Sequence, residues 1–164
     1  MKVKAYVLVG VAAFLSLSAV PKDVRSGEGF SPGDLAPRIK SLGNESDFNF
    51  QNHSGRYTLL HFWAAYDGES RARNIKLSNE ISKLSSGKIA LCSVSFDENK
   101  FIFSETIRMD KLDETTQFHA GRLSESDIYD KYNLKKGFRN FLINGEGLIV
   151  ATDVTPEELA NLLH

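Results

Sequence analysis

The feature that most constrains the fold is the uninterrupted apolar run "YTLLHFWA", from Tyr57 to Ala64. The run is short and rich in aromatic and branched side chains, which is typical of a strand buried on both faces. The polar segment "DGES" ends it, and from Arg71 to Leu84 apolar residues recur at helical spacing. The sequence therefore predicts a central strand that passes through a turn into a helix.

Strands and helices alternate along the rest of the chain. Lys88 to Phe96 predicts a second buried strand, and "DENKFIFSETIRM" a second helix with Asp97 as its N-cap. The segments that follow predict a short strand at Thr115–His119, a short helix opening at Ser124 or Ser126, a β-hairpin over residues 138–154 and a closing helix over residues 155–164. This order predicts an α/β protein in three layers, with helices on both faces of a mixed sheet.

The closing helix carries a complete start signal. Thr155 is placed as its N-cap and Pro156 as its first residue. Glu158 stands at the third helical position, so that Thr155 and Glu158 form a capping box.

The first twenty residues differ in composition from the remainder. "MKVK" is followed by an uncharged, mostly apolar run from Ala5 to Val20, which is the plan of a secretory signal peptide. The run is shorter than the roughly 20 residues of a comfortable membrane span, although an uncleaved N-terminal anchor stays open. Residues 21–34, rich in Gly, Pro and Ser, predict a flexible linker. We therefore expect one domain over residues 35–164, exported to the periplasm or another extracytoplasmic space.

Charge and cysteine content exclude several functions. The 20 Lys and Arg residues nearly balance the 21 Asp and Glu residues, so nothing favours nucleic acid or an anionic membrane as partner. A membrane contact is expected only through an uncleaved N-terminal segment. Cys92 is the only cysteine, which rules out an intramolecular disulfide and a two-cysteine redox centre.

Three phrases, in their order along the chain, resemble the thioredoxin-like superfamily, above all its exported TlpA/ResA-like branch, which is related to the AhpC/TSA proteins. "LLHFWAAYDGESR" resembles the strand that ends in Phe-Trp-Ala and continues through an aromatic residue into Cys-x-x-Cys and Arg. "LCSVSFDEN" resembles the second strand, and "IYDKYNLKKGFRNFLINGEGLIV" the stretch with the cis-proline and the glycine turn. The resemblance implies a thioredoxin-like three-layer α/β/α sandwich over residues 35–164.

The sequence departs from the family at the residues that carry its chemistry. Transferred position by position, the two cysteines fall on Asp67 and Ser70, and the buried acid on His61. The cis-proline falls on Phe138, or on Arg139 if the loop differs by one residue, and either peptide bond is expected to be trans. The resemblance thus indicates a degenerate member in which Asp67-Gly68-Glu69-Ser70 replaces the Cys-x-x-Cys motif.

Thiol–disulfide exchange needs a thiolate and a second thiol. The family's frame lowers the pKa of the first cysteine at a helix N-terminus. Asp67 places a carboxylate there, which cannot form a disulfide, and the pKa of the Ser70 hydroxyl is too high for the exchange without a paired base. Asp67 is then a helix N-cap, or a fixed mimic of the thiolate charge on a binding surface. Ser70 is expected to be a structural residue of the first helical turn.

The remaining reactive side chains favour structural roles. Cys92 lies in a predicted buried strand, where its thiol stays protonated. His61 is expected to be neutral and buried with a hydrogen-bond partner. No metal site or other cofactor is expected, because the possible ligands show no ligand spacing: His53, His61, His119 and Asp67.

A binding surface is expected around the degenerate loop. Its candidate residues are Tyr66, Asp67, Gly68, Glu69, Arg71, Phe138 and Arg139. Basic residues flank the loop, and they form either a weak anion- or peptide-binding rim or a solvated face: Arg71, Arg73, Lys76, Lys135, Lys136 and Arg139. An extended peptide is expected to add to the exposed strand edge there.

Three hypotheses follow for function. The leading one is an exported thioredoxin-fold protein without redox activity and without a catalytic residue, which acts as a binding or accessory module for a protein or peptide. The alternative is an enzyme, a thiol–disulfide oxidoreductase that works through Cys92 alone or with a partner's cysteine. A metal carrier is the third.

Overall fold

The computed structural model describes residues 27–39, 50, 56–84, 87–122 and 127–163. Its strands are β1 (Tyr57–Trp63), β2 (Ile89–Ser95), β3 (Gln117–His119), β4 (Asn140–Ile143) and β5 (Ile149–Thr152). Its helices are α1 (Gly68–Lys83), α2 (Lys100–Asp110), α3 (Asp127–Lys131) and α4 (Pro156–Leu163), with 3₁₀ turns at Glu114–Thr116 and Leu134–Lys136. None of the described helices is long and apolar enough to cross a membrane.

The described strands form one mixed sheet in the order β3-β2-β1-β4-β5. β1 pairs in parallel with β2, and β2 in parallel with β3, because each pair is joined through a helix. β4 runs antiparallel to both β1 and β5. In the central strand β1, every residue after Tyr57 is buried, as the apolar run predicts.

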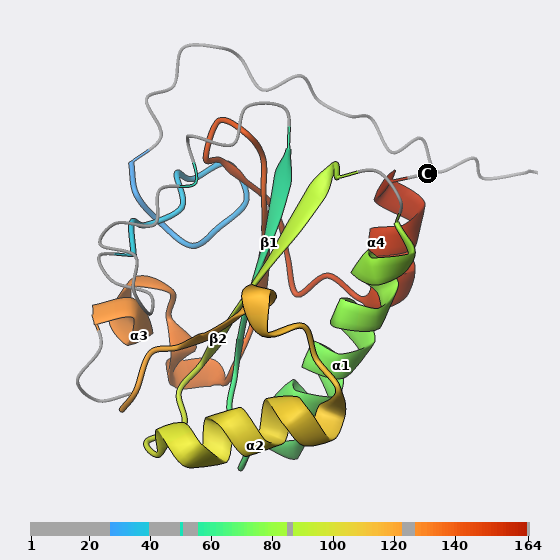
Figure 1. Cartoon of the computed structure of the whole chain (residues 1–164). Coiled ribbons are helices and arrows are strands. Elements are labelled where there is room, and N and C mark those ends of the chain that lie inside the picture. The colour runs from blue at the N-terminus through green and yellow to red at the C-terminus, as the bar shows by residue number, and fades with distance from the viewer. Residues whose placement is uncertain (1–26, 40–49, 51–55, 85–86, 123–126, 164) are drawn as a thin grey trace, which may run out of the picture.

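Helices cover both faces of the sheet, which confirms the predicted three-layer α/β architecture (Figure 1). On one face, Leu59 of β1 packs with Leu77 of α1 and Leu159 of α4. On the other, Phe62 of β1 packs with Tyr132, which follows α3. α2 lies near the end of β1 that leads into α1, and it contacts Trp63 there through Phe103.

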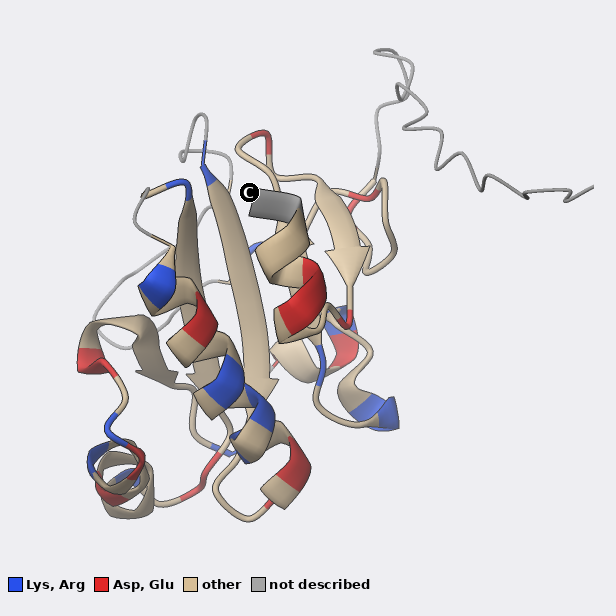
Figure 2. Cartoon of the chain, turned by 90° about the vertical axis from the view of Figure 1, so that its right-hand side faces the viewer, with Lys and Arg blue, Asp and Glu red and all other residues tan. Residues whose placement is uncertain are grey.

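α1 shows why this stretch is an amphipathic helix. Its buried side chains Ser70, Asn74 and Leu77 recur at spacings of four and three residues and face the sheet. Its outward face carries acidic and basic residues interspersed along the helix, as Figure 2 shows.

Local start signals are confirmed at α4 and corrected at α2. The Thr155 N–H donates to Glu158 Oε2 at 2.9 Å, and the Glu158 N–H donates to Thr155 Oγ1 at 3.2 Å, as in the predicted capping box. The expectation that Asp97 caps the second helix is wrong. Asn99 is the N-cap and accepts from the Phe101 N–H at 2.8 Å, because the Asp97 carboxylate is occupied by the Ala65 N–H and the Ser95 hydroxyl.

The N-terminal part of the described chain lies against the hairpin. The Gly33 N–H donates to the Ile149 carbonyl at 2.8 Å, and the Ile149 N–H donates to the Asp34 carbonyl at 2.9 Å. Residues 27–34, which the sequence assigned to a linker, are therefore joined to the domain. The predicted signal peptide at residues 1–20, the linker residues 21–26 and the helix starts at Ser124 or Ser126 lie outside the described residues.

Candidate functional site

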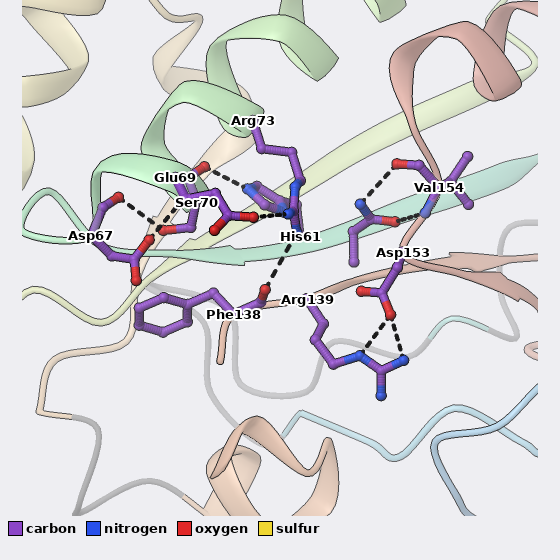
Figure 3. A network of polar contacts seen from close by, with 10 residues as sticks. His61, Asp67, Glu69, Ser70, Arg73, Phe138, Arg139, Asp153 and Val154 are labelled. Carbon is purple, nitrogen blue, oxygen red and sulfur yellow. Dashed lines mark hydrogen bonds and ion pairs between the residues drawn. The ribbon is translucent and has the colours of Figure 1, made fainter. Parts of the chain in front are cut away.

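Asp67 caps α1 at the junction where the resemblance places the attacking cysteine (Figure 3). Its Oδ1 accepts a hydrogen bond from the Ser70 N–H at 2.8 Å. Its backbone carbonyl accepts from the Arg71 N–H at 3.0 Å and starts the helical hydrogen-bond pattern. The predicted N-cap is confirmed, and the helix N-terminus is complemented by a carboxylate instead of a thiolate.

Ser70 uses its hydroxyl within the same turn. The hydroxyl donates to the Asp67 carbonyl at 3.2 Å and accepts from the Ala64 N–H at 3.4 Å. The residue is 3% exposed. Among the described residues, no histidine or carboxylate side chain is hydrogen bonded to this hydroxyl. Ser70 therefore joins the end of β1 to α1 and has no base that would activate it as a nucleophile.

His61, at the position of the family's buried acid, lies fully buried in β1. Its Nε2 lies 3.1 Å from the Ser70 carbonyl, which can only accept, so we assign the ring proton to Nε2. Burial lowers the pKa of His61 from 6.5 to about 4; the Ser70 carbonyl opposes this shift, Arg73 adds to it, and the Arg139 backbone opposes it. The expected burial and hydrogen bond of His61 are confirmed, and the lowered pKa favours the neutral ring.

Phe138 occupies the position that corresponds to the family's cis-proline. The described peptide bonds are all trans, as expected for Phe138 and Arg139. The Phe138 ring stacks on Phe96 with centroids 6.1 Å apart and lies 6.3 Å from the ring of Tyr66. Its carbonyl accepts from Arg73 Nη1 at 3.5 Å. An aromatic ring and an arginine thus lie at the loop where the resemblance places the cis-proline.

Four of the six predicted basic rim residues are compensated by carboxylates. The pairs are Arg71 with Asp110, Arg73 with Glu69, Arg139 with Asp153, and Lys135 with Asp130. Within the part of the chain that the structure describes, Lys76 and Lys136 form no ion pair. This arrangement favours the solvated face over an anion-binding rim.

The candidate binding residues divide into three groups. Tyr66, Asp67 and Phe138 lie together at the start of α1. Gly68 and Glu69 are exposed in the first turn of the helix. Arg71 is drawn toward α2 by Asp110, and Arg139 toward the end of β5 by Asp153, so the last two diverge from the others.

Asp97 is the site residue that sequence reasoning assigned to another role. Both of its carboxylate oxygens accept from the Ala65 N–H, at 2.9 and 3.1 Å, and Oδ2 also accepts from the Ser95 hydroxyl at 2.7 Å. Its carbonyl lies 2.7 Å from Nε2 of His119. These contacts tie the site loop to the end of β2. The sequence signal for this role was Ser95, which lies two residues before Asp97, so that its hydroxyl can reach the Asp97 carboxylate.

Two grooves flank the site loop, each of about 830 Å³. One lies between the loop and α2, and its lining includes Tyr66, Phe96, Asp97, Glu98, Ile102 and Tyr129. The other lies between α1 and the segments that precede β4 and α4, and its lining includes Ser70, Arg73, Phe138, Arg139 and Asp153. The sequence did not predict the first groove, since α2 and α3 complete it only in the folded chain.

Metal ligands do not gather in the described part of the chain. No group of three or more His, Cys, Asp or Glu side chains there is placed to hold a metal ion. His61 and His119 each face a backbone carbonyl, and His53 lies outside the described residues. Cys92 is 1% exposed in β2.

Solved thioredoxin-fold structures superpose on this chain. A thioredoxin-like protein from Parabacteroides distasonis is 58% identical, with a TM-score of 0.76 over 82% of this chain and 96% of that one. The thioredoxin domain of a thiol-disulfide oxidoreductase from Bacteroides vulgatus is 22% identical, with a TM-score of 0.66 over 80% and 94% of the two chains. StoA from Bacillus subtilis is 20% identical, with a TM-score of 0.60 over 78% and 100%. No family model and no curated protein matches the chain.

These similarities confirm the predicted fold and the resemblance to the thioredoxin-like superfamily. The two more distant structures share the fold alone. The degenerate site is also confirmed, because the chain has a single cysteine and that cysteine lies in β2, away from the start of α1.

Proposed function

We propose that this chain, which belongs to the thioredoxin-like family, acts as a redox-inactive binding or accessory module. The observation that carries the proposal is the Asp67 carboxylate, which occupies the α1 N-terminus and accepts the Ser70 N–H at 2.8 Å. A sulfur that attacks a disulfide would have to occupy this position at the helix N-terminus, and a carboxylate cannot form a disulfide. The second position holds Ser70, whose hydroxyl is hydrogen bonded to the backbone.

The burial of Cys92 argues against the alternative oxidoreductase. Cys92 lies in β2 opposite Leu60 of β1, and it belongs to the apolar core together with Phe62 and Val94. A disulfide sulfur would have to reach it through the helices or by separation of the central strands. An apolar environment also keeps the thiol protonated and therefore weakly nucleophilic.

We propose that the module works outside the cytoplasm. The support is the basic start "MKVK" and the apolar run that follows it, which together have the plan of a secretory signal. The partner we propose is a protein or peptide that contacts the degenerate site. Tyr66, which is 69% exposed beside Asp67, supports this choice because it lines a groove next to the site loop together with Phe96 and Ile102.

The test is an insulin-reduction assay with dithiothreitol as electron donor. We expect the wild-type protein to match the blank without protein, and an active thioredoxin in parallel to verify the assay. The Cys92→Ala variant should give the same result as wild type. Turnover by the wild-type protein that Cys92→Ala abolishes would overturn the proposal in favour of the oxidoreductase.

A further inference from the structure

The groove between the site loop and α2 has apolar walls that are open to solvent. Tyr66 stands on the loop side with 69% of its surface exposed, and Ile102 stands on the α2 side with 48% exposed. Phe96 and Tyr129 line the groove as well. Aromatic and aliphatic surface that converges on one hollow is the usual feature of a site that receives an apolar side chain.

Two carboxylates line the same groove and a third lies beside it. Asp97 and Glu98 belong to its lining, and Asp67 lies next to Tyr66. The pKa of the Tyr66 phenol is raised by partial burial and then by the charges of Asp97, Asp67 and Glu98. Three anionic groups therefore act at the position of this ring.

The two arginines that line the groove, Arg71 and Arg122, each form an ion pair with a carboxylate. Arg71 donates from Nε and Nη2 to both carboxylate oxygens of Asp110, at 2.7 and 2.6 Å. Arg122 lies 3.4 Å from Glu98 in a pair whose two side chains are exposed, an arrangement that holds both groups weakly. Asp97 is largely buried in the groove lining, and its carboxylate already accepts from the Ala65 N–H and the Ser95 hydroxyl, so that it acts on the groove mainly through its charge.

We propose that this groove binds an extended peptide segment of a partner protein, in which an apolar side chain is adjacent to a lysine or arginine. The inference rests on the proposed function and names the chemistry of its partner. The apolar side chain enters between Tyr66 and Ile102. The cation lies over the exposed face of the Tyr66 ring, where the nearby carboxylates attract it and the ring itself favours a positive charge. An acidic segment is rejected by the same carboxylates.

The experiment selects binders from a phage library of random heptapeptides on the immobilised full chain. Peptides with the enriched sequence are then synthesised with a fluorescent label, and their Kd values are measured by anisotropy at low and high salt. Tyr66→Ala and Ile102→Ser test the two walls of the groove. Phe101→Ser is the matched control, since Phe101 is 70% exposed on the same helix but does not line the groove. Circular dichroism verifies that each variant is folded.

We expect enrichment of sequences with an apolar residue next to Lys or Arg. Tyr66→Ala and Ile102→Ser should each raise the Kd about tenfold or more, the size of effect found for central contact residues. Phe101→Ser should leave the Kd unchanged, and high salt should weaken the wild-type complex. The proposal is overturned by a selection without consensus, by an acidic consensus, or by equal binding to the wall variants and wild type. These outcomes are independent of insulin reduction, so failure of the groove and failure of the redox-inactive assignment are separate results.

Discussion

At the scale of single residues, the Asp67 carboxylate lies at the β1–α1 junction, where the resemblance places a cysteine thiolate. A thiolate at a helix N-terminus is stabilised by unpaired N–H groups and by the helix dipole. The Asp67 carboxylate uses the same groups, and its Oδ1 accepts the Ser70 N–H. The two anions differ in chemistry, because only the sulfur can attack a disulfide. The helix start is therefore compatible with loss of the reaction.

The first prediction concerns the cap. Asp67→Ala should lower the free energy of unfolding by about 1 kcal/mol, the usual contribution of an N-cap, because the Ser70 N–H loses its acceptor. Asp67→Asn is the matched control and should keep most of the stability, since its amide oxygen can accept the same hydrogen bond. Urea denaturation measures both changes. Equal stability of Asp67→Ala and wild type would show that the carboxylate does not act as a cap.

The second prediction concerns the pH dependence of stability through His61. Its pKa is 6.5 in the unfolded chain and about 4 in the fold, chiefly because of burial. Between these values the unfolded state binds more protons than the native state, so stability falls as the pH falls from 6.5 towards 4. The loss integrates to about 3 kcal/mol.

Urea denaturation across this pH range measures that loss, and variants assign it. In His61→Gln the protein should be less stable at neutral pH, but the part of the pH dependence that belongs to His61 should disappear. His119→Gln is the matched control and should retain the slope of the wild-type protein. A slope in His61→Gln equal to that of wild type would contradict the assignment of the buried neutral histidine.

At the scale of elements, one ion pair joins α1 to α2. Arg71 of α1 and Asp110 at the end of α2 meet through two hydrogen bonds, with side chains 30% and 9% exposed. The Asp110 carboxylate raises the pKa of Arg71, mainly through its hydrogen bond. A pair with one nearly buried partner depends on that partner remaining compensated.

The third prediction uses this pair in a double-mutant cycle. Arg71→Met should destabilise the protein by about 1 to 3 kcal/mol, because it leaves the Asp110 carboxylate poorly solvated. Adding Asp110→Asn should restore part of the loss. Arg108→Met, which breaks an exposed pair with Glu105 on α2, is the control and should hardly change the urea midpoint. Strict additivity of Arg71→Met and Asp110→Asn would contradict the coupling.

The elements also show which predictions a sequence supports. β1 and the capping box of α4 were predicted because their signals, an apolar run and a residue pair three positions apart, are local. The N-cap of α2 was assigned incorrectly because Asp97 bonds to Ala65, a partner 32 residues away that no local rule identifies.

At the scale of the whole molecule, the fold was predicted in full outline and the site only in part. The order of strands and helices followed from the apolar runs and helical spacings, and three phrases identified it as thioredoxin-like. The residues at the degenerate positions Asp67, Ser70 and His61 lie together as expected. The groove toward α2 was not predicted. Ile102 and Tyr129 reach it from helices whose packing depends on the entire sheet.

The whole molecule also limits where redox chemistry can occur. Cys92 carries the only thiol of the chain, so any thiol–disulfide exchange by this protein must pass through a mixed disulfide at its Sγ. That thiol is 1% exposed and lies within the apolar core. Its reaction therefore requires unfolding, and the rate of reaction should follow the population of open molecules.

The most direct measurement is the mass of the native protein after incubation with oxidised glutathione. We predict an unchanged mass under native conditions and a single glutathione adduct at Cys92 once denaturant unfolds the chain. Adduct formation on the native protein, at a rate that denaturant does not increase, would contradict the redox-inactive assignment.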